Sequence, residues 1–125
     1  MTGHLSDAAT LRATLRRELT AAMKARDPDA VAVLRTAIAA IDNAEAVAAP
    51  QAAPPATSAH IAGARAGLGA AEAPRGQLTG DEIQAILRAQ LAEYGREADR
   101  YAGHGQHAAA ERLRNQASLL SRYLS

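Results

Sequence analysis

Large apolar residues recur at helical spacing in the first third of the chain. Between residues 11 and 23 one falls at every fourth position, which predicts an amphipathic helix with a single buried stripe. A second repeat with helical spacing runs from residue 31 to residue 41 and predicts a second helix. The first stripe is Leu11, Leu15, Leu19 and Met23, and the second is Val31, Leu34, Ile38 and Ile41.

Capping residues mark the ends of these two helices. Ser6 or Thr10 is the expected N-cap of the first helix, because a hydroxyl oxygen there accepts a hydrogen bond from an otherwise unpaired backbone N–H. Asp27 is the expected N-cap of the second helix, and Pro28 follows at the first helical position, where its missing N–H costs nothing. We expect the second helix to fray near residues 46–47, before the prolines that follow.

Residues 46–76 consist mostly of Ala, Pro and Gly. Prolines break a helix and glycines loosen it, and the few large apolar side chains cannot offset the entropy lost on ordering. We therefore predict a flexible linker between a first helical segment, residues 1–45, and a second, residues 77–125; a short helical turn near residues 58–66 and a docking peptide are the alternatives. The large apolar residues of this linker are Val47, Ile61 and Leu68.

Helical spacing returns after residue 77. Thr79 and Glu82 frame a capping box, which predicts the start of a third helix. Glycines on both sides of His104 predict a tight turn that ends this helix and leads into a fourth. Gly95, inside the third helix, suggests that another backbone approaches closely there. The third stripe is Ile83, Leu87, Leu91, Tyr94, Ala98 and Tyr101, and the fourth is Ala109, Leu113, Ala117, Leu120 and Leu124.

The composition agrees with a small all-α protein. Hydrophobic residues make up 48% of the 125 residues, but there is no Phe, no Trp and no Cys. That supply suits a thin core between helices, whereas a β-sandwich or barrel needs more β-branched and aromatic residues. We predict a small bundle of about four helices, in which consecutive helices pair as two antiparallel hairpins. Ile38 and Leu87, at the middle of their stripes, are expected in its core.

No pattern for catalysis, for a cofactor or for a metal site is present in the sequence. Phosphate-binding loops, dinucleotide-binding glycine motifs and the HExxH zinc motif are all missing. His104 and His107 have a spacing that can ligate a metal from one helix face, but only Glu111 is near as a third ligand. Solvent-exposed histidines at a turn are the simpler interpretation. We therefore predict no catalytic residue, no cofactor and no bound metal.

Positive charge is concentrated along the first predicted helix. Over the whole chain 14 basic residues face 13 acidic ones, a balance that argues against a strongly basic nucleic-acid-binding protein. The alternative interpretation is an ordinary surface on which arginines pair with acids such as Glu18 or Asp99. The residues predicted to contact RNA or another partner are Arg12, Arg16, Arg17, Lys24 and Arg26. The fourth helix is also locally positive, through Arg112, Arg114 and Arg122.

The start of the chain and its hydropathy bear on where the protein is found. No stretch is long and apolar enough to suggest a transmembrane helix. The first residues do not combine a basic region with an apolar one, as a signal peptide would. We therefore expect a cytoplasmic protein that does not associate with membranes.

Several stretches resemble the GatB/YqeY domain family. Residues 23–27 read MKARD, and residues 34–45 contain LR followed by AAIDNAE, similar to the family's helix with "LR…AAI.NAE". After a gap, residues 78–83 read LTGDEI, similar to "LTDEEV". Residues 96–103 are similar to "RREsaeaYrkaG", and LSRYL at residues 120–124 is similar to "LeeYLP". The order and spacing of these stretches agree over nearly all of the predicted helices.

This resemblance implies a YqeY-like helical domain, similar to the helical part of the C-terminal domain of the GatB subunit of glutamine-dependent tRNA amidotransferase, a carbon–nitrogen ligase. It does not extend to the C-terminal subdomain that usually follows in the family and that reaches tRNA in GatB. We expect a non-enzymatic helical adaptor whose partner is tRNA or a tRNA-processing protein, with the oligomeric state left open. A tRNA-binding accessory module is the alternative. A standalone amidotransferase-like ligase is a third hypothesis, against which the missing catalytic residues argue.

Overall fold

The computed structural model describes residues 7–48 and 77–125, which form four α-helices and no strand. This architecture confirms the predicted all-α bundle. The helices are α1, Ala8–Ala25; α2, Pro28–Ala48; α4, Gly80–Gly103; and α5, His107–Ser121. Residues 46–48, expected in the linker, continue α2, and the remainder of the predicted linker lies outside the described residues.

Aspartates cap the first two helices. Asp7 is the N-cap of α1, and its carboxylate accepts a hydrogen bond from the Thr10 N–H at 2.9 Å. The prediction of Thr10 as the cap is therefore wrong, and Ser6 lies outside the described residues. Asp27 caps α2 as expected, because its Oδ1 accepts a hydrogen bond from the Ala30 N–H at 3.1 Å.

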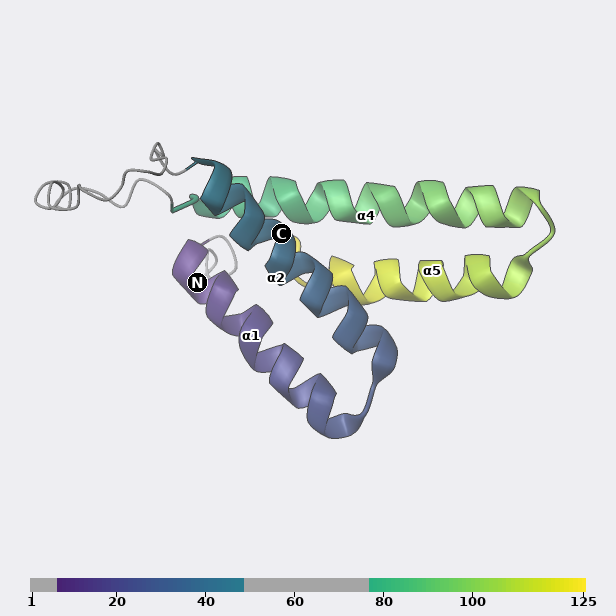
Figure 1. The fold of residues 1–125 in the computed structure, drawn as a ribbon, viewed down its shortest axis with the longest axis horizontal. Helices are drawn as coiled ribbons and strands as arrows, with labels where there is room; N and C mark the ends of the chain where they lie inside the picture. The colour runs from purple at the N-terminus through teal and green to yellow at the C-terminus, as the bar shows by residue number, and fades with distance from the viewer. Residues whose placement is uncertain (1–6, 49–76) are drawn as a thin grey trace, which may run out of the picture.

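The connection between α1 and α2 depends on one residue in the left-handed region. Arg26 has φ 57° and ψ 47°, a conformation that ends many helices. Its N–H donates to the Met23 carbonyl at 3.1 Å, and the Asp27 N–H donates to the Ala22 carbonyl at 3.0 Å. This tight turn makes α1 and α2 an antiparallel hairpin (Figure 1).

The second hairpin begins with the predicted capping box. The Glu82 N–H donates to Thr79 Oγ1 at 3.1 Å, and the Thr79 N–H donates to Glu82 Oε1 at 2.8 Å. At the other end of α4, Gly105 adopts a φ of 77°, which the turn into α5 requires and which glycine adopts without strain. The pairing of α4 with α5 confirms the second predicted hairpin.

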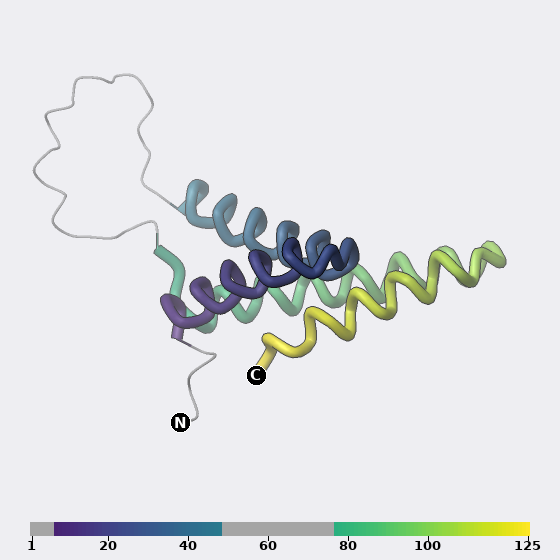
Figure 2. Tube along the Cα trace, turned by 90° about the horizontal axis from the view of Figure 1, so that it is seen from below, coloured from purple at the N-terminus to yellow at the C-terminus, as the bar shows by residue number. Residues whose placement is uncertain are grey.

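The two hairpins pack against each other at one end of the longer one. Figure 1 shows α4 and α5 side by side, extending well beyond the region where α1 and α2 lie across them. α2 contacts both α4 and α5, whereas α1 contacts α4. The end of α2 and the start of α4 lie at the same end of the molecule in both views (Figures 1 and 2).

The core lies where the hairpins meet. Leu87 is fully buried as predicted, but Ile38 is only partly buried, because Ala37 occupies the core-facing position beside it. At the end of α1 the same shift by one residue leaves Met23 50% exposed while Ala22 is 8% exposed, so the predicted place of Met23 in the stripe is wrong. The largest fully buried side chains are Leu11, Leu15, Val33, Ile41, Ile83, Leu87 and Leu120.

The far half of the second hairpin is packed around alanine. Ala98 and Ala110 are almost fully buried between α4 and α5, whereas Tyr101, expected in the stripe, is 39% exposed. Ala109, expected to be buried, is only partly so. A Cβ atom added at Gly95 would meet nothing within 4 Å, so the predicted close approach of a backbone is wrong. Figure 1 shows α4 and α5 side by side along this half, beyond the part of the hairpin that the ribbons of α1 and α2 cross.

A buried amide attaches the end of the chain to α4. Gln84 is 2% exposed, and its Nε2 donates to the Tyr123 carbonyl at 3.1 Å. Its Oε1 accepts a hydrogen bond from the Ser125 N–H at 3.1 Å. Both ends of the amide are therefore satisfied, which is the condition under which a buried polar side chain is tolerated. As a result Tyr123 is held against the core, where it is 8% exposed.

Candidate functional site: the turn end of the first hairpin

The predicted basic edge of α1 divides into two parts. Arg12 forms an ion pair with Glu45 of α2, and both side chains are largely covered. Arg16 lies 3.7 Å from the Asp42 carboxylate, also on α2, although this pair is exposed. These two guanidinium groups are therefore used inside the hairpin, where their charge is balanced by acids of the neighbouring helix.

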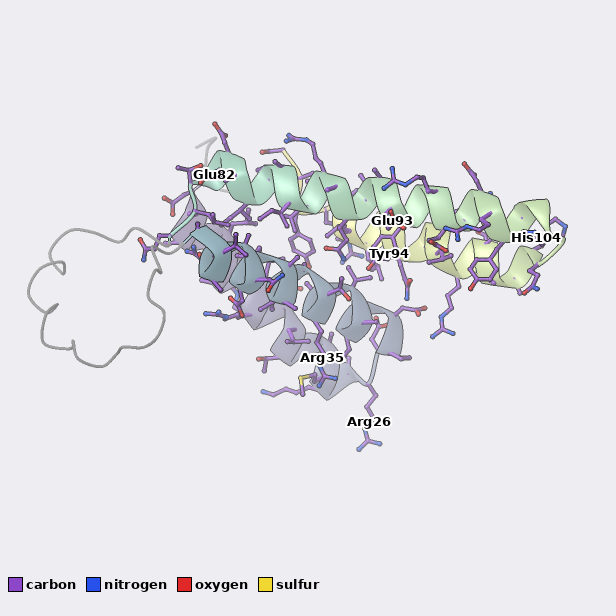
Figure 3. The ribbon with its side chains drawn as sticks, turned by 45° about the horizontal axis from the view of Figure 1, so that its top comes forward. Arg26, Arg35, Glu82, Glu93, Tyr94 and His104 are labelled. Carbon is purple, nitrogen blue, oxygen red and sulfur yellow. The ribbon has the colours of Figure 1, made fainter. Side chains whose placement is uncertain are left out.

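The remaining three predicted contact residues have no acidic partner among the described residues. The Arg17 guanidinium donates a hydrogen bond to Thr14 Oγ1 at 3.3 Å. Lys24 and Arg26 are exposed and form no ion pair within residues 7–48 and 77–125. Both lie at the turn between α1 and α2, and Figure 3 shows Arg26 pointing away from the helices there.

Arg35 of α2 was not among the predicted contact residues, although it belongs with Lys24 and Arg26. It is exposed, forms no ion pair with any described residue, and lies toward the same end of the hairpin as Arg26 (Figure 3). Sequence alone gave no signal for this grouping, because it depends on α2 folding back along α1. We call Lys24, Arg26 and Arg35 the turn-end cations.

Beside the turn is a hollow of about 210 Å³ where α1, α2 and the end of α5 meet, which we call the junction hollow. Ala21 and Ala25 of α1 and Ala30 of α2 line its sides. Val33 and Tyr123, both nearly buried, are also part of its lining. The hollow exists because alanine side chains occupy positions where larger ones would fill the space.

Three charged side chains also line the junction hollow: Glu18, Asp27 and Arg122. Asp27 is the helix cap already described, so part of its hydrogen-bonding capacity serves the backbone of α2. Glu18 and Arg122 form no ion pair with any residue the structure describes, so of the two acids named in the alternative interpretation, Glu18 and Asp99, Asp99 is the one that pairs with an arginine. Burial, and next the negative charge of Glu18, raise the pKa of the Tyr123 phenol above its usual value.

Away from this end, ion pairs neutralise most charges of α4 and α5. Arg96 pairs with Glu93 at 2.6 Å, and the hydrogen bond and positive charge of Arg96 lower the pKa of the Glu93 carboxyl. Arg100 pairs with Glu97, and Arg114 lies 3.8 Å from Asp99, as one interpretation of the sequence expected. Arg112 of α5 pairs with Asp29 of α2 at 2.9 Å. Among the described residues, three cations without an acidic partner, Lys24, Arg26 and Arg35, lie toward the turn end of the first hairpin. The others are Arg17, Arg122 and Arg88, whose guanidinium donates to the Ser125 carbonyl at 3.0 Å.

The histidines considered as metal ligands lie at the opposite end of the molecule. His104 Nδ1 is 2.9 Å from the Arg100 carbonyl oxygen, and Figure 3 places His104 at the turn between α4 and α5. Within residues 7–48 and 77–125, no group of three or more His, Asp and Glu side chains is arranged to hold a metal ion. No helix in these ranges combines the length and apolar character needed to cross a membrane.

Comparisons with known proteins give no further guide to the site. No protein-family model, no curated protein and no solved structure matches this chain. The resemblance to GatB/YqeY domains therefore stays a prediction from the sequence, and the candidate site rests on its own geometry.

Proposed function

We propose that this chain is a non-enzymatic helical adaptor that binds a macromolecular partner at the turn end of the α1–α2 hairpin. The observation that carries the proposal is the uneven pairing of its basic residues. Arg12 and Arg16 are balanced by acids of α2, whereas Lys24, Arg26 and Arg35 have no acidic partner among the described residues. The charge of a cation without an acidic neighbour is not neutralised within the protein, so such cations are available to attract a partner of opposite charge.

The arrangement of hydroxyl groups and histidines supports a binding role over catalysis. Thr20 Oγ1 donates to the Arg16 carbonyl at 3.2 Å, and Ser121 Oγ donates to the Ser118 carbonyl at 2.8 Å. Nucleophilic catalysis requires a hydroxyl within hydrogen-bond distance of a base. In the part of the chain that the structure describes, no hydroxyl is hydrogen-bonded to a histidine or a carboxylate side chain.

The sequence resemblance suggests the cellular setting of such an adaptor. It links the chain to GatB/YqeY domains and so to glutamine-dependent tRNA amidotransferase, with tRNA or a tRNA-processing protein as partner. The turn-end cations favour a tRNA-binding accessory module as the second candidate, since phosphates are recognised by unpaired Lys and Arg. That module would use Lys24 and Arg26, and not Arg12 or Arg16, from the edge predicted on α1.

Affinity capture with matched variants tests the proposed function. The full chain, immobilised, is incubated with lysate of the source cell, with and without RNase treatment. The test variant is Lys24→Ala, Arg26→Ala, Arg35→Ala, and the control is Arg12→Ala, Arg16→Ala. We expect one protein to be retained after RNase treatment, lost with the test variant and kept with the control.

Two results would contradict this function. Equal capture by the test variant and the wild type would mean that the turn-end cations are not the binding site. Retention of tRNA alone would favour the RNA-binding module instead. In that case the binding constant should fall by about 0.7–0.9 log units for each phosphate contact when the salt concentration rises tenfold.

A further inference from the structure

We propose that the junction hollow binds a free amino acid with a short aliphatic side chain. The ammonium group of this ligand lies against Glu18, its carboxylate against Arg122, and its side chain against the alanines of the lining. The proposal goes beyond the adaptor function and does not depend on it, because the turn-end cations do not line the hollow. It is carried by the opposite charges on the hollow, by the helix ends that meet there, and by the volume of the hollow.

Two side chains of opposite charge line the hollow without pairing with each other. Glu18 belongs to α1 and Arg122 directly follows α5, and neither forms an ion pair with any residue that the structure describes. An unpaired carboxylate and an unpaired guanidinium on one small hollow are complementary to a ligand that carries both an ammonium and a carboxylate group. Because an arginine can hold a carboxylate through two parallel hydrogen bonds, Arg122 can also fix the orientation of such a ligand.

The Tyr123 hydroxyl lies near both of these charges. Burial is the largest cause of the raised pKa of this phenol; the charge of Glu18 raises the pKa further, and the charge of Arg122 lowers it. Each charge must be close to the phenol to have such an influence, because Coulomb interactions weaken with distance. All three side chains line the hollow, so three polar groups converge on it. A few convergent polar groups in a hollow are typical of small-molecule sites.

The helix ends around the hollow favour a ligand with an ammonium group. The last turn of α1 contributes Ala22 and Ala25 to the lining, and the last turn of α5 contributes Leu119. The C-terminal end of a helix carries partial negative charge, which attracts a cation. Asp27 offsets the positive end of α2 as its cap and adds a second carboxylate beside that of Glu18. Negative groups therefore outnumber positive ones, which argues against a simple anion such as phosphate.

The volume of the hollow limits the ligand to a small molecule. Its value of about 210 Å³ is below the roughly 300–1,000 Å³ of typical small-molecule and cofactor pockets. At about 30 Å³ for each water in the liquid, the hollow holds roughly seven groups of that size. A free amino acid such as valine has about this many non-hydrogen atoms, whereas a nucleotide or an aromatic amino acid has clearly more.

Alanine methyl groups provide a surface for the side chain of the ligand. Ala21 and Ala25 of α1 and Ala30 of α2 line the hollow, together with the nearly buried Val33. A short aliphatic side chain placed against these groups is removed from water, which is favourable. Among the described residues that line the hollow there is no Ser, Thr, Asn or Gln to bind a polar side chain. The lining therefore favours an aliphatic amino acid over a polar one.

Titrations followed by NMR spectroscopy test the proposal. L-valine is added to the isotope-labelled full chain, at constant pH and ionic strength. Two matched ligands are titrated in the same way: isobutylamine, which lacks the carboxylate, and isovalerate, which lacks the ammonium group. The test variants are Glu18→Gln and Arg122→Gln. Glu111→Gln and Arg17→Gln make the same chemical changes at exposed positions outside the hollow and are the controls.

We expect L-valine to shift the amide signals of residues around the hollow, with a dissociation constant of about 1 mM, in keeping with its small size. Isobutylamine and isovalerate should each bind at least tenfold more weakly. Each test variant should weaken valine binding at least tenfold, and each control should stay within twofold of the wild type. Ala25→Leu, which fills the hollow from an exposed position, should abolish binding, whereas Ala13→Leu, exposed on the same helix and outside the hollow, should not.

Several results would overturn the proposal. They are the absence of any shift around the hollow with L-valine at saturating millimolar concentrations, and an affinity for either matched ligand equal to that for valine. Unchanged valine binding by Glu18→Gln or Arg122→Gln, or similar weakening in the control variants, would overturn it as well. The comparison of the three ligands uses the wild-type chain alone, so it decides the case even if a variant fails to fold.

Discussion

Leu87 and Ile38 were both expected in the core, and the structure separates them. Leu87 is fully buried among residues of both hairpins, whereas Ile38 is only partly buried on α2. The cost of truncating an apolar side chain depends on the area it buries and on the cavity left behind. The two residues therefore offer a direct measure of where the core lies.

We predict that Leu87→Ala lowers the free energy of unfolding by about 2–5 kcal/mol. Ile38→Ala should cost clearly less, because part of that side chain is already in contact with water. Urea unfolding followed by circular dichroism measures both values. Equal losses would mean that the face of α2 that packs in the core is not the one described.

Tyr123 should make the protein less stable at alkaline pH. The phenol has a raised pKa in the folded protein, first because it is buried and second because Glu18 is near. In the unfolded chain it loses its proton near pH 10, so above about pH 10 the folded state binds more protons than the unfolded state. The contribution is complete below pH 10 and is lost as pH rises through the higher pKa of the folded state.

The measurement compares the wild type with Tyr123→Phe by urea unfolding at pH 8 and pH 11. Between these values the wild type should lose more free energy of unfolding than the variant, which has no proton to lose at this position. If both proteins show the same loss, ionisation of Tyr123 is not coupled to folding.

At the scale of the helices, stability at the ends depends on a few capping side chains. In the capping box of α4, the side chains of Thr79 and Glu82 each accept a hydrogen bond from the other's backbone N–H. α5, in contrast, begins after Gln106 without any side-chain cap. The start of α4 is thus the better secured of the two in the second hairpin.

Thr79→Ala should therefore lower the free energy of unfolding by about 1 kcal/mol, since an unpaired N–H remains at the start of α4. Thr36→Ala makes the same chemical change at an exposed position inside α2. Because alanine is the better helix former there, this control should be neutral or slightly stabilising. Thermal unfolding of both variants measures the two changes in stability. A similar loss of stability in both variants would show that the cap contributes little.

The helices were largely predictable because their signals are local. Asp27, Thr79 and Glu82 form the expected caps, and each involves atoms only three residues apart. The buried face was less predictable. If α1 is rotated about its axis by one residue, Ala22 takes the buried position in place of Met23, and both residues are apolar. Which of the two is buried depends on the neighbouring helices.

The candidate site was predictable only in part. Lys24 and Arg26 were expected at a contact surface, but the pairing of Arg12 with Glu45 joins residues 33 positions apart. The junction hollow combines three helices and small side chains, and no short motif in the sequence marks such a place. Both features follow from how the hairpins pack, which lies beyond what local spacing can indicate.

At the scale of the whole molecule, the described helices of the two hairpins contact each other directly. α2 packs on α4 and α5, and the end of α2 lies at the same end of the molecule as the start of α4 (Figure 2). The segment between them was predicted to be a flexible linker. A shorter connection between these two points should therefore preserve the fold.

Deleting residues 52–71 should leave the thermal midpoint almost unchanged, with a difference below about 4 °C, which corresponds to roughly 1 kcal/mol in a domain of this size. The residues that remain between α2 and α4 can still join two points at one end of the molecule. Differential scanning calorimetry of the shortened and full chains makes the comparison. A much larger drop would show that the deleted residues pack against the helices.

Because the second hairpin extends beyond the first, the free energy required for local unfolding should decrease along α4 with distance from the shared core. Near its start, Ile83 and Leu87 are anchored in the shared core, while further along α4 the fully buried hydrophobic side chain is the small Ala98. Local openings require the least free energy where few apolar contacts must be broken. Backbone amides near Ala98 should exchange with deuterium through such openings, and those near Leu87 mainly through global unfolding. The far half of the second hairpin would then behave as a separate cooperative unit, which can separate and close again while the turn end of the first hairpin stays folded.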